Sequence, residues 1–188
     1  TQFTKGQALT KNADRTLRRT QRKGYDRYQL RRALLIEQLE KLGMYSGQTL
    51  RLSKLELWGL RAKAVSEQLS PLELGRVLCH INQKRGYKTA KSDFGDKKTG
   101  EYVTSVVNRY SELHELNQTI GQYMYAKLTA DPAFRCKERV YPRAAYIEEY
   151  DAVMACQSSF YPELLTDEII QHIRNYIIFH QRPLKSCK

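Results

Sequence analysis

The chain has few of the features that mark membrane-spanning, disulfide-rich or zinc-binding proteins. Its 188 residues contain no signal peptide and no apolar run long enough to cross a bilayer. The cysteines stand far apart without a Cys-x-x-Cys pair, which argues against a zinc site and a disulfide framework. They are Cys79, Cys136, Cys156 and Cys187. We therefore expect a reduced cytoplasmic protein that does not bind a membrane.

Catalytic patterns are also missing. The histidines are isolated and lack metal-ligand spacing, so structural roles are favoured. They are His80, His114, His172 and His180. No glycine-rich phosphate loop is present. Glu148, Glu149 and Asp151 are close in sequence, but consecutive helical residues do not face one another, so we interpret them as solvated surface. The sequence predicts no catalytic residue and no cofactor in this chain.

Acidic residues are scarce where basic residues are dense. Lysine and arginine number 32 against 20 acids, which gives a net charge of +12 and a pI near 9.6. Between Lys11 and Arg32 there are nine basic residues and two acids, so this stretch carries +7 of the total. Concentrated positive charge is typical of a nucleic-acid partner.

The spacing in this stretch predicts a basic helical face, with Asn12 or Asp14 as its N-cap. One stripe of basic residues has the spacing i, i+3, i+4 and i+7, and a second stripe of basic residues lies beside it. The first comprises Arg15, Arg18, Arg19 and Arg22, and the second comprises Lys23, Arg27 and Arg31. Gly24 lowers helix propensity, but we expect a continuous helix. Guanidinium groups suit phosphate. The alternative, a solvated salt-bridged face, lacks sufficient acids.

Beyond Arg32 the same helix becomes core-forming. Leu34, Leu35 and Leu39 belong to an apolar stripe that ends at Gly43. The front of the helix should therefore project while its rear is anchored. We place a boundary here, with an extended lead-in and basic helix over 1–43 and a helical domain over 44–188.

The rest of the sequence predicts an all-α fold, because no stretch shows the alternation of apolar and polar residues that is typical of strands. Capping boxes open helices at Ser70 and Thr119. Further helices are expected within 50–68, over 102–116 (where valines leave a strand open), from near Pro142, and from Thr166 to Pro183. Residues 92–101 are expected to form a loop. The last helix should bury Ile169, Ile170, Ile173, Tyr176 and Ile177.

A second basic patch follows the helix that begins at Ser70. It contains Lys84, Arg85, Lys88 and Lys91, with Tyr87 directly before Lys88. An aromatic residue among cations can stack on a base, but a capped helix end followed by a solvated loop explains the pattern equally well.

Five strings, in order, resemble type II CRISPR effector nucleases of the compact II-C branch. Arg15–Leu35 resembles their arginine-rich bridge helix. The strings 57–64 and 69–87 resemble the start of their recognition region. The strings 143–150 and 179–186 resemble the segment that leads back toward the nuclease core.

The resemblance implies a bacterial antiviral function, in which this chain positions guide RNA and the guide–target duplex of an RNA-guided DNA endonuclease. It implies backbone contacts by the two stripes above, by Lys84, Arg85 and Lys88, and by Arg182 and Lys185. The RuvC-like and HNH centres, with Mg²⁺, would lie outside this chain. Guide RNA and target DNA are the expected partners of a monomer.

Two other functions remain open at this point. The charge alone also fits a free-standing helical RNA- or DNA-binding protein. A protein-interaction module is the third possibility, and an anti-CRISPR inhibitor that covers the same arginines is one such partner.

Overall fold

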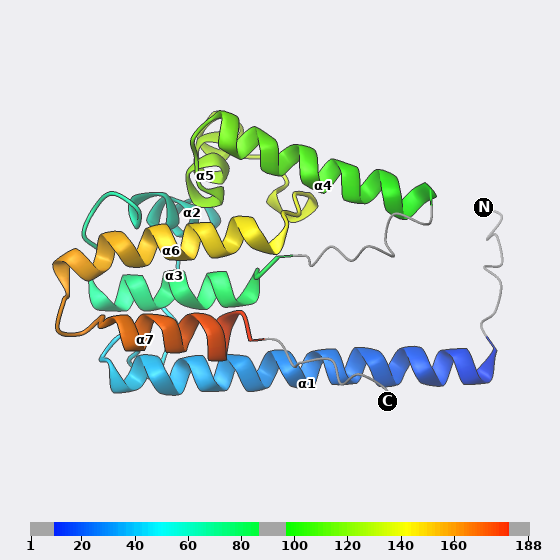
Figure 1. Cartoon of the computed structure of the whole chain (residues 1–188), viewed down its shortest axis with the longest axis horizontal. Helices are drawn as coiled ribbons and strands as arrows, with labels where there is room; N and C mark the ends of the chain where they lie inside the picture. Colours follow the sequence, from blue (N-terminus) through cyan, green and yellow to red (C-terminus); the bar gives the residue numbers. More distant parts are fainter. Residues whose placement is uncertain (1–9, 87–96, 181–188) are drawn as a thin grey trace.

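The computed structural model describes residues 10–86 and 97–180, and this part of the chain is all-α, as predicted. Figure 1 shows the arrangement of its helices. They are α1 (Lys11–Lys41), α2 (Lys54–Lys63), α3 (Pro71–Gln83), α4 (Lys97–Glu115), α5 (Ile120–Ala130), α6 (Arg143–Phe160) and α7 (Asp167–His172). A 3-10 turn at Cys136–Glu138 precedes α6, and a π-helical turn at Ile173–Ile178 continues α7. No helix of the described residues is both long and apolar enough to cross a membrane.

The basic stretch forms the front of α1, a continuous helix of 31 residues. Its N-cap is Thr10, whose side chain accepts a hydrogen bond from the Ala13 backbone N–H, so the predicted caps Asn12 and Asp14 are wrong. Both lie inside the first turn. Gly24 does not bend the helix, and α1 ends before Gly43, which has a positive φ of 67°.

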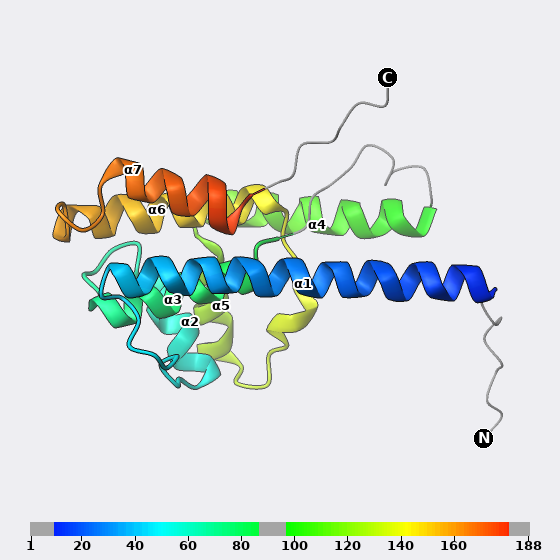
Figure 2. The ribbon, with the colours of Figure 1, turned by 90° about the horizontal axis from the view of Figure 1, so that it is seen from below.

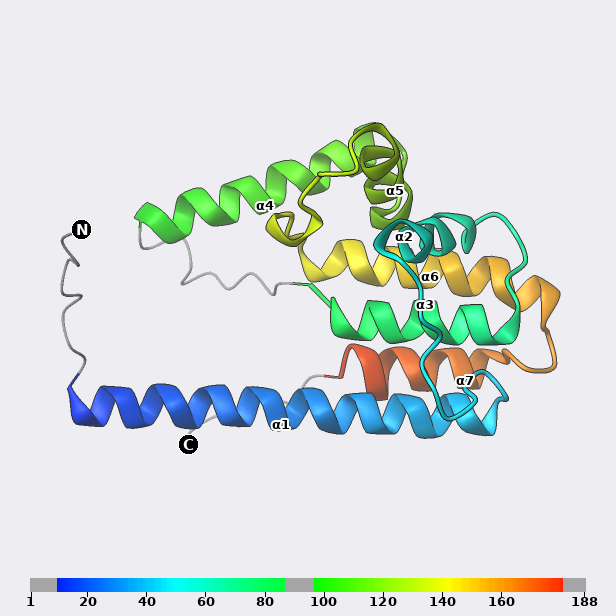
Figure 3. The ribbon, with the colours of Figure 1, turned by 180° about the vertical axis from the view of Figure 1, so that it is seen from behind.

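The rear of α1 is anchored and its front projects, as the sequence predicts. Leu35 and Leu39 are buried, whereas Leu34, expected in the same stripe, is 40% exposed. This half packs on α3 and on the π-helical turn. Figures 1, 2 and 3 show α1 extending well past the end of α3, while α4 extends in the same direction on another side of the molecule. Helices α2 to α7 form the body of the molecule. In the part of the chain that the structure describes, residues 15–27 of α1 are exposed.

The helix starts that were predicted from capping boxes are confirmed at Ser70 and Thr119, and Ser53 adds a third. Helix α2 is shorter than the predicted 50–68 segment. Leu57 is buried in it, whereas Leu55 is 45% exposed. The predicted 92–101 loop is wrong from Lys97 onward, where α4 begins, and 92–96 lie outside the described residues. Helix, and not strand, is confirmed for 102–115.

The last helix differs from its prediction at its C-terminal end. Ile173 and Ile177 are buried as expected, but Tyr176 is 66% exposed. The π-helical turn changes the residue repeat, which rotates Tyr176 away from the core. The turn ends at Ile178, and the predicted end at Pro183 lies outside the described residues.

A buried ion pair joins the helices of the body. Glu149 of α6 was expected at the surface, but both Glu149 and Arg61 of α2 are 0% exposed, and that expectation is wrong. Arg61 donates to both carboxylate oxygens of Glu149, with Nε 3.0 Å from Oε1. Glu149 Oε1 also accepts the Gly121 backbone N–H at 2.9 Å. A Cβ on Gly121 would lie 2.7 Å from that oxygen, so glycine allows α5 to approach this closely.

His80 of α3 belongs to the same network. Its Nδ1 lies 3.3 Å from Arg61 Nη1 and therefore accepts the hydrogen bond. Burial, followed by the charge of Arg61, lowers the pKa of His80 to about 2, so the imidazole is neutral. The Arg61 guanidinium also lies 4.6 Å from the centre of the Trp58 ring. The structural role expected of this histidine is confirmed, and the network fixes α2, α3, α5 and α6 relative to one another.

Candidate nucleic-acid interface

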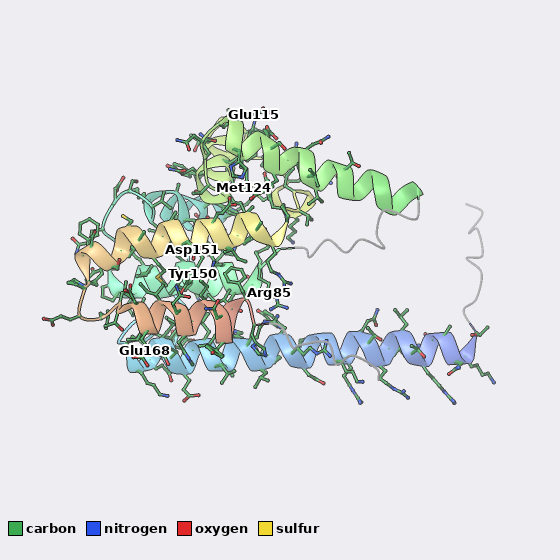
Figure 4. The ribbon with its side chains drawn as sticks, viewed as in Figure 1. Arg85, Glu115, Met124, Tyr150, Asp151 and Glu168 are labelled. Atoms are coloured by element: carbon green, nitrogen blue, oxygen red, sulfur yellow. The ribbon has the colours of Figure 1, made fainter. Side chains whose placement is uncertain are left out.

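The predicted basic stripes are exposed on the projecting half of α1. The exposed residues are Arg15, Arg18, Arg19, Arg22, Lys23 and Arg27. Figure 4 shows long side chains extending outward from this half of the helix. Among the described residues, Arg18 alone of the six has an ion pair, with Asp14 at 2.9 Å. Both partners are well exposed, and such pairs contribute little. This face can therefore contact an extended anionic surface without first breaking strong internal pairs.

Arg31 has a different environment from the other predicted arginines. It is only half-exposed, and its buried Nε has no hydrogen-bond partner. Burial is the main factor that lowers the pKa of Arg31, and the charge of Arg143 is the next. The structure thus brings Arg31 toward Arg143, a residue to which the sequence assigned no contact.

Arg31, Arg85 and Arg143 form an arginine junction where α1 enters the body. Arg85 follows the end of α3, as labelled in Figure 4, and Arg143 opens α6. Burial, followed by the charges of Arg31 and Arg143, lowers the pKa of Arg85 to about 10, so it stays cationic at neutral pH. Nε and Nη1 of Arg143 are buried without a partner. Within the described residues no carboxylate pairs with the junction.

A junction of this kind is unfavourable until an anion joins it. Three like charges repel, and buried N–H donors without acceptors retain their desolvation cost. A phosphate oxygen supplies both the opposite charge and the acceptor. Since the junction and the exposed face share α1, one phosphate backbone could contact both.

Gly86 and the backbone at the end of the π-helical turn position Arg85. Gly86 has φ +82°, and a Cβ there would lie 2.8 Å from the Cα of Arg143. The turn after α3 therefore packs directly on the start of α6. Arg85 Nη1 donates to the carbonyls of Ile178 and His180, each at 3.2 Å. Part of the hydrogen-bonding capacity of Arg85 thus caps the end of the π-helical turn. The prediction of a capping role therefore holds for Arg85 in part.

Lys84, the residue before Arg85, lines a pocket with Lys54, Trp58 and Phe134. The predicted contacts Lys88, Arg182 and Lys185 lie outside the described residues and remain predictions.

Sequence reasoning missed Arg143 and Arg61, although both left a signal. Arg143 occupies the first turn of α6, where a positive charge opposes the helix dipole and an acid is preferred. Arg61 lies three residues after Trp58 and three before Ala64, on the buried face of its helix. A cation in either setting indicates a specific partner.

The described residues contain no cluster of three or more histidine, cysteine or acidic side chains that could hold a metal ion. Cys79, Cys136 and Cys156 are free thiols. Burial raises the pKa of Cys79 and Cys136, so these two are neutral. The cationic side chains are the chemically distinctive groups of this surface.

No protein-family model and no curated protein matches the chain. Its fold does match solved Cas9 structures. A complex of St1Cas9, sgRNA, AcrIIA6 and tDNA59-ntPAM matches with TM-score 0.72 and 24% identity over 95% of this chain and 22% of that one. Campylobacter jejuni Cas9 with sgRNA and target DNA matches with TM-score 0.72 and 21% identity over 92% and 25%. Streptococcus thermophilus Cas9 in complex with the GGAA PAM matches with TM-score 0.65 and 21% identity over 91% and 15%.

These matches show that the chain has the fold of one segment of Cas9. They confirm, for the fold, the resemblance found in the sequence. The chain spans between 15% and 25% of the length of the three Cas9 chains above.

Proposed function

We propose that this chain is the guide-RNA-binding segment of a Cas9-type RNA-guided DNA endonuclease. In this proposal α1 is the bridge helix and α2 to α7 belong to the recognition region. The parent protein would hold the RuvC-like and HNH nuclease centres and their Mg²⁺ outside this chain. The activity, antiviral role and bacterial cytoplasmic location of that parent belong to the same proposal.

One observation carries the proposal: a single helix joins an exposed arginine face to a junction of three arginines that no carboxylate of the described residues neutralises. An exposed face alone fits any polyanion. The junction adds a fixed position, because Arg85 is held by backbone carbonyls and Arg143 by the start of α6. Phosphates that reach Arg31, Arg85 and Arg143 would set the register of the strand along α1.

The protein groups in this interface recognise backbone, not base sequence. Guanidinium and ammonium groups neutralise phosphates and release counterions, whatever the bases. In RNA-guided nucleases, base pairing with the guide supplies sequence specificity, while the protein holds the duplex by its backbone and A-form shape. The arginines and lysine of the α1 face suit the role of the protein in this arrangement, which is to hold the backbone. Contacts by Lys88, Arg182 and Lys185 would extend the interface.

A second candidate is a protein-interaction surface, because the St1Cas9 structure above contains AcrIIA6. An acidic inhibitor would use the same exposed arginines as the RNA. Competition between such a protein and guide RNA for this chain supports a shared surface, whereas simultaneous binding contradicts it. A free-standing nucleic-acid-binding protein would bind RNA without preference for a guide scaffold.

The proposal is tested by reversing charges on α1. We expect Arg18→Glu, Arg19→Glu and Arg22→Glu together to weaken guide-RNA binding by about tenfold to a hundredfold at moderate salt, because several phosphate contacts are lost. The matched control reverses three exposed cations outside α1, Arg51, Lys63 and Lys127. Fluorescence anisotropy of labelled RNA gives both dissociation constants. Equal loss in the two variants would refute the assignment of the interface to α1.

A further inference from the structure

A pocket of about 500 Å³ lies between the start of α2, the end of α3 and residues 133–137. This size is within the range of small-molecule sites. The side chains that line it come from Lys54, Leu57, Trp58, His80, Lys84, Ala133, Phe134, Arg135, Cys136 and Lys137. Lys84 is the residue before Arg85, so the pocket begins one residue along the chain from the arginine junction.

The floor of this pocket is apolar, aromatic and uncharged. Trp58 and Cys136 are 5% and 6% exposed, and Leu57 is also buried. His80 is a neutral imidazole whose Nδ1 is occupied by Arg61. The Arg61 guanidinium lies 4.6 Å from the centre of the Trp58 ring, and the His80 ring meets Trp58 in a T-shaped contact with ring centroids 4.8 Å apart. The floor is therefore preformed, because the buried Arg61–Glu149 pair fixes the residues behind it.

The rim of the same pocket is cationic. Lys54, Lys84 and Lys137 line it, and no aspartate or glutamate does. Lys54 Nζ donates to the Phe134 carbonyl, which ties the 133–137 segment to the start of α2. The charges of Lys54 and Lys84 both reach the Cys136 thiol, which places them on one side of the floor. An occupant that matches this pattern has an apolar flat part and an anionic group beside it.

We propose that the pocket receives one unstacked nucleotide of a bound RNA strand. The base would lie against the Trp58 and Phe134 side, and its phosphate would contact Lys84 and Lys137. Aromatic walls accept any base by its flat face, and splayed nucleotides of single-stranded RNA bind in this manner. The inference rests on the proposed function for its ligand class, since the strand would arrive from the neighbouring Arg85.

Trp58 makes the test direct, because it is the single tryptophan of the chain. We expect adenosine monophosphate to quench Trp58 fluorescence saturably, adenosine to bind about tenfold more weakly, and inorganic phosphate to cause no quenching. Lys84→Gln with Lys137→Gln should weaken the nucleotide by about tenfold or more. The control pair, Lys41→Gln with Lys63→Gln, should leave it unchanged. Equal affinity in both pairs would overturn the proposal.

A labelled single-stranded RNA separates this inference from the proposed function. Suppose that anisotropy shows the RNA to bind, while Trp58 fluorescence changes with neither the RNA nor the mononucleotide. That result would overturn the pocket assignment and leave the α1 interface standing. A mononucleotide that quenches Trp58 while the strand does not bind supports the pocket and contradicts the proposed function. A glutamate-rich, phenylalanine-containing peptide that alters Trp58 emission when the mononucleotide does not would make this a protein-docking site, against the proposal.

Discussion

Breaking the buried Arg61–Glu149 pair gives the strongest test of how the body is held together. Glu149→Gln keeps the shape of the side chain and an acceptor for the Gly121 N–H, but it leaves the Arg61 charge unbalanced. Arg61→Met leaves the Glu149 carboxylate without its partner. Both side chains are 0% exposed, so water cannot compensate either charge without a rearrangement of the core.

The expected cost of each single substitution is about 3–5 kcal/mol, the range for removal of one partner of a buried ion pair. In a chain of this size that loss lowers the melting temperature by roughly 6–20 °C. The double variant replaces both charges, so its cost should be well below the sum of the single costs, with a coupling of about 2 kcal/mol or more.

Urea unfolding of the four proteins gives the free energy of unfolding and the coupling between the two sites. The exposed pair Lys41–Glu37 is the matched control, and Glu37→Gln there should leave the free energy of unfolding nearly unchanged. Single substitutions at Arg61 and Glu149 that cost no more than this control, or a double variant that is simply additive, would refute the argument that this pair organises the body.

Three further outcomes follow from the junction and its surroundings. Gly86→Ala should lower the free energy of unfolding by about 1–3 kcal/mol, since φ is +82° and the new Cβ meets Arg143. Gly24→Ala, in open space within α1, should raise the free energy of unfolding by about 0.5–1 kcal/mol. Urea unfolding of the two variants should therefore give changes of opposite sign. Because folding lowers the pKa of His80 from 6.5 to about 2, the neutral form favours the folded state. Its stabilisation is present above pH 6.5 and is lost as the pH falls. Wild type should thus lose about 2 kcal/mol more than His80→Gln between pH 7 and pH 5, as measured by urea unfolding, and parallel losses would contradict this. Arg31→Met should stabilise the free chain by about 0.5–2 kcal/mol while it weakens RNA binding, and a variant that is less stable in the absence of RNA would contradict the unpaired junction.

The sequence predicted most of the fold through local signals. Capping boxes at Ser70 and Thr119 specified helix starts. In each box the cap side chain accepts the backbone N–H of the residue three positions on, and the side chain of that residue accepts the backbone N–H of the cap. The charge of the α1 face was also predictable, because the spacing of Arg15, Arg18 and Arg22 alone places them on one side of a helix.

The parts that depend on tertiary contacts were not predicted. Glu149 was expected in solvent with its neighbours, yet it lies three residues after Tyr146 and four before Val153, on the buried face of α6. Its charge is stable there because Arg61 comes from a helix 88 residues away. Local spacing identifies the face, but only the fold supplies the partner. The same holds for Arg143, which meets Arg31 and Arg85 from a distant part of the chain.

Whether α1 binds guide RNA is tested most directly by the salt dependence of guide-RNA binding to this chain, beside an unrelated RNA of equal length. About five neutralised phosphates on a single strand predict a slope near −3.5 in a plot of log affinity against log salt concentration. We expect this slope, together with tighter binding of the guide scaffold than of the unrelated RNA. A slope near zero would contradict it, since the arginines of α1 would then not contact phosphate.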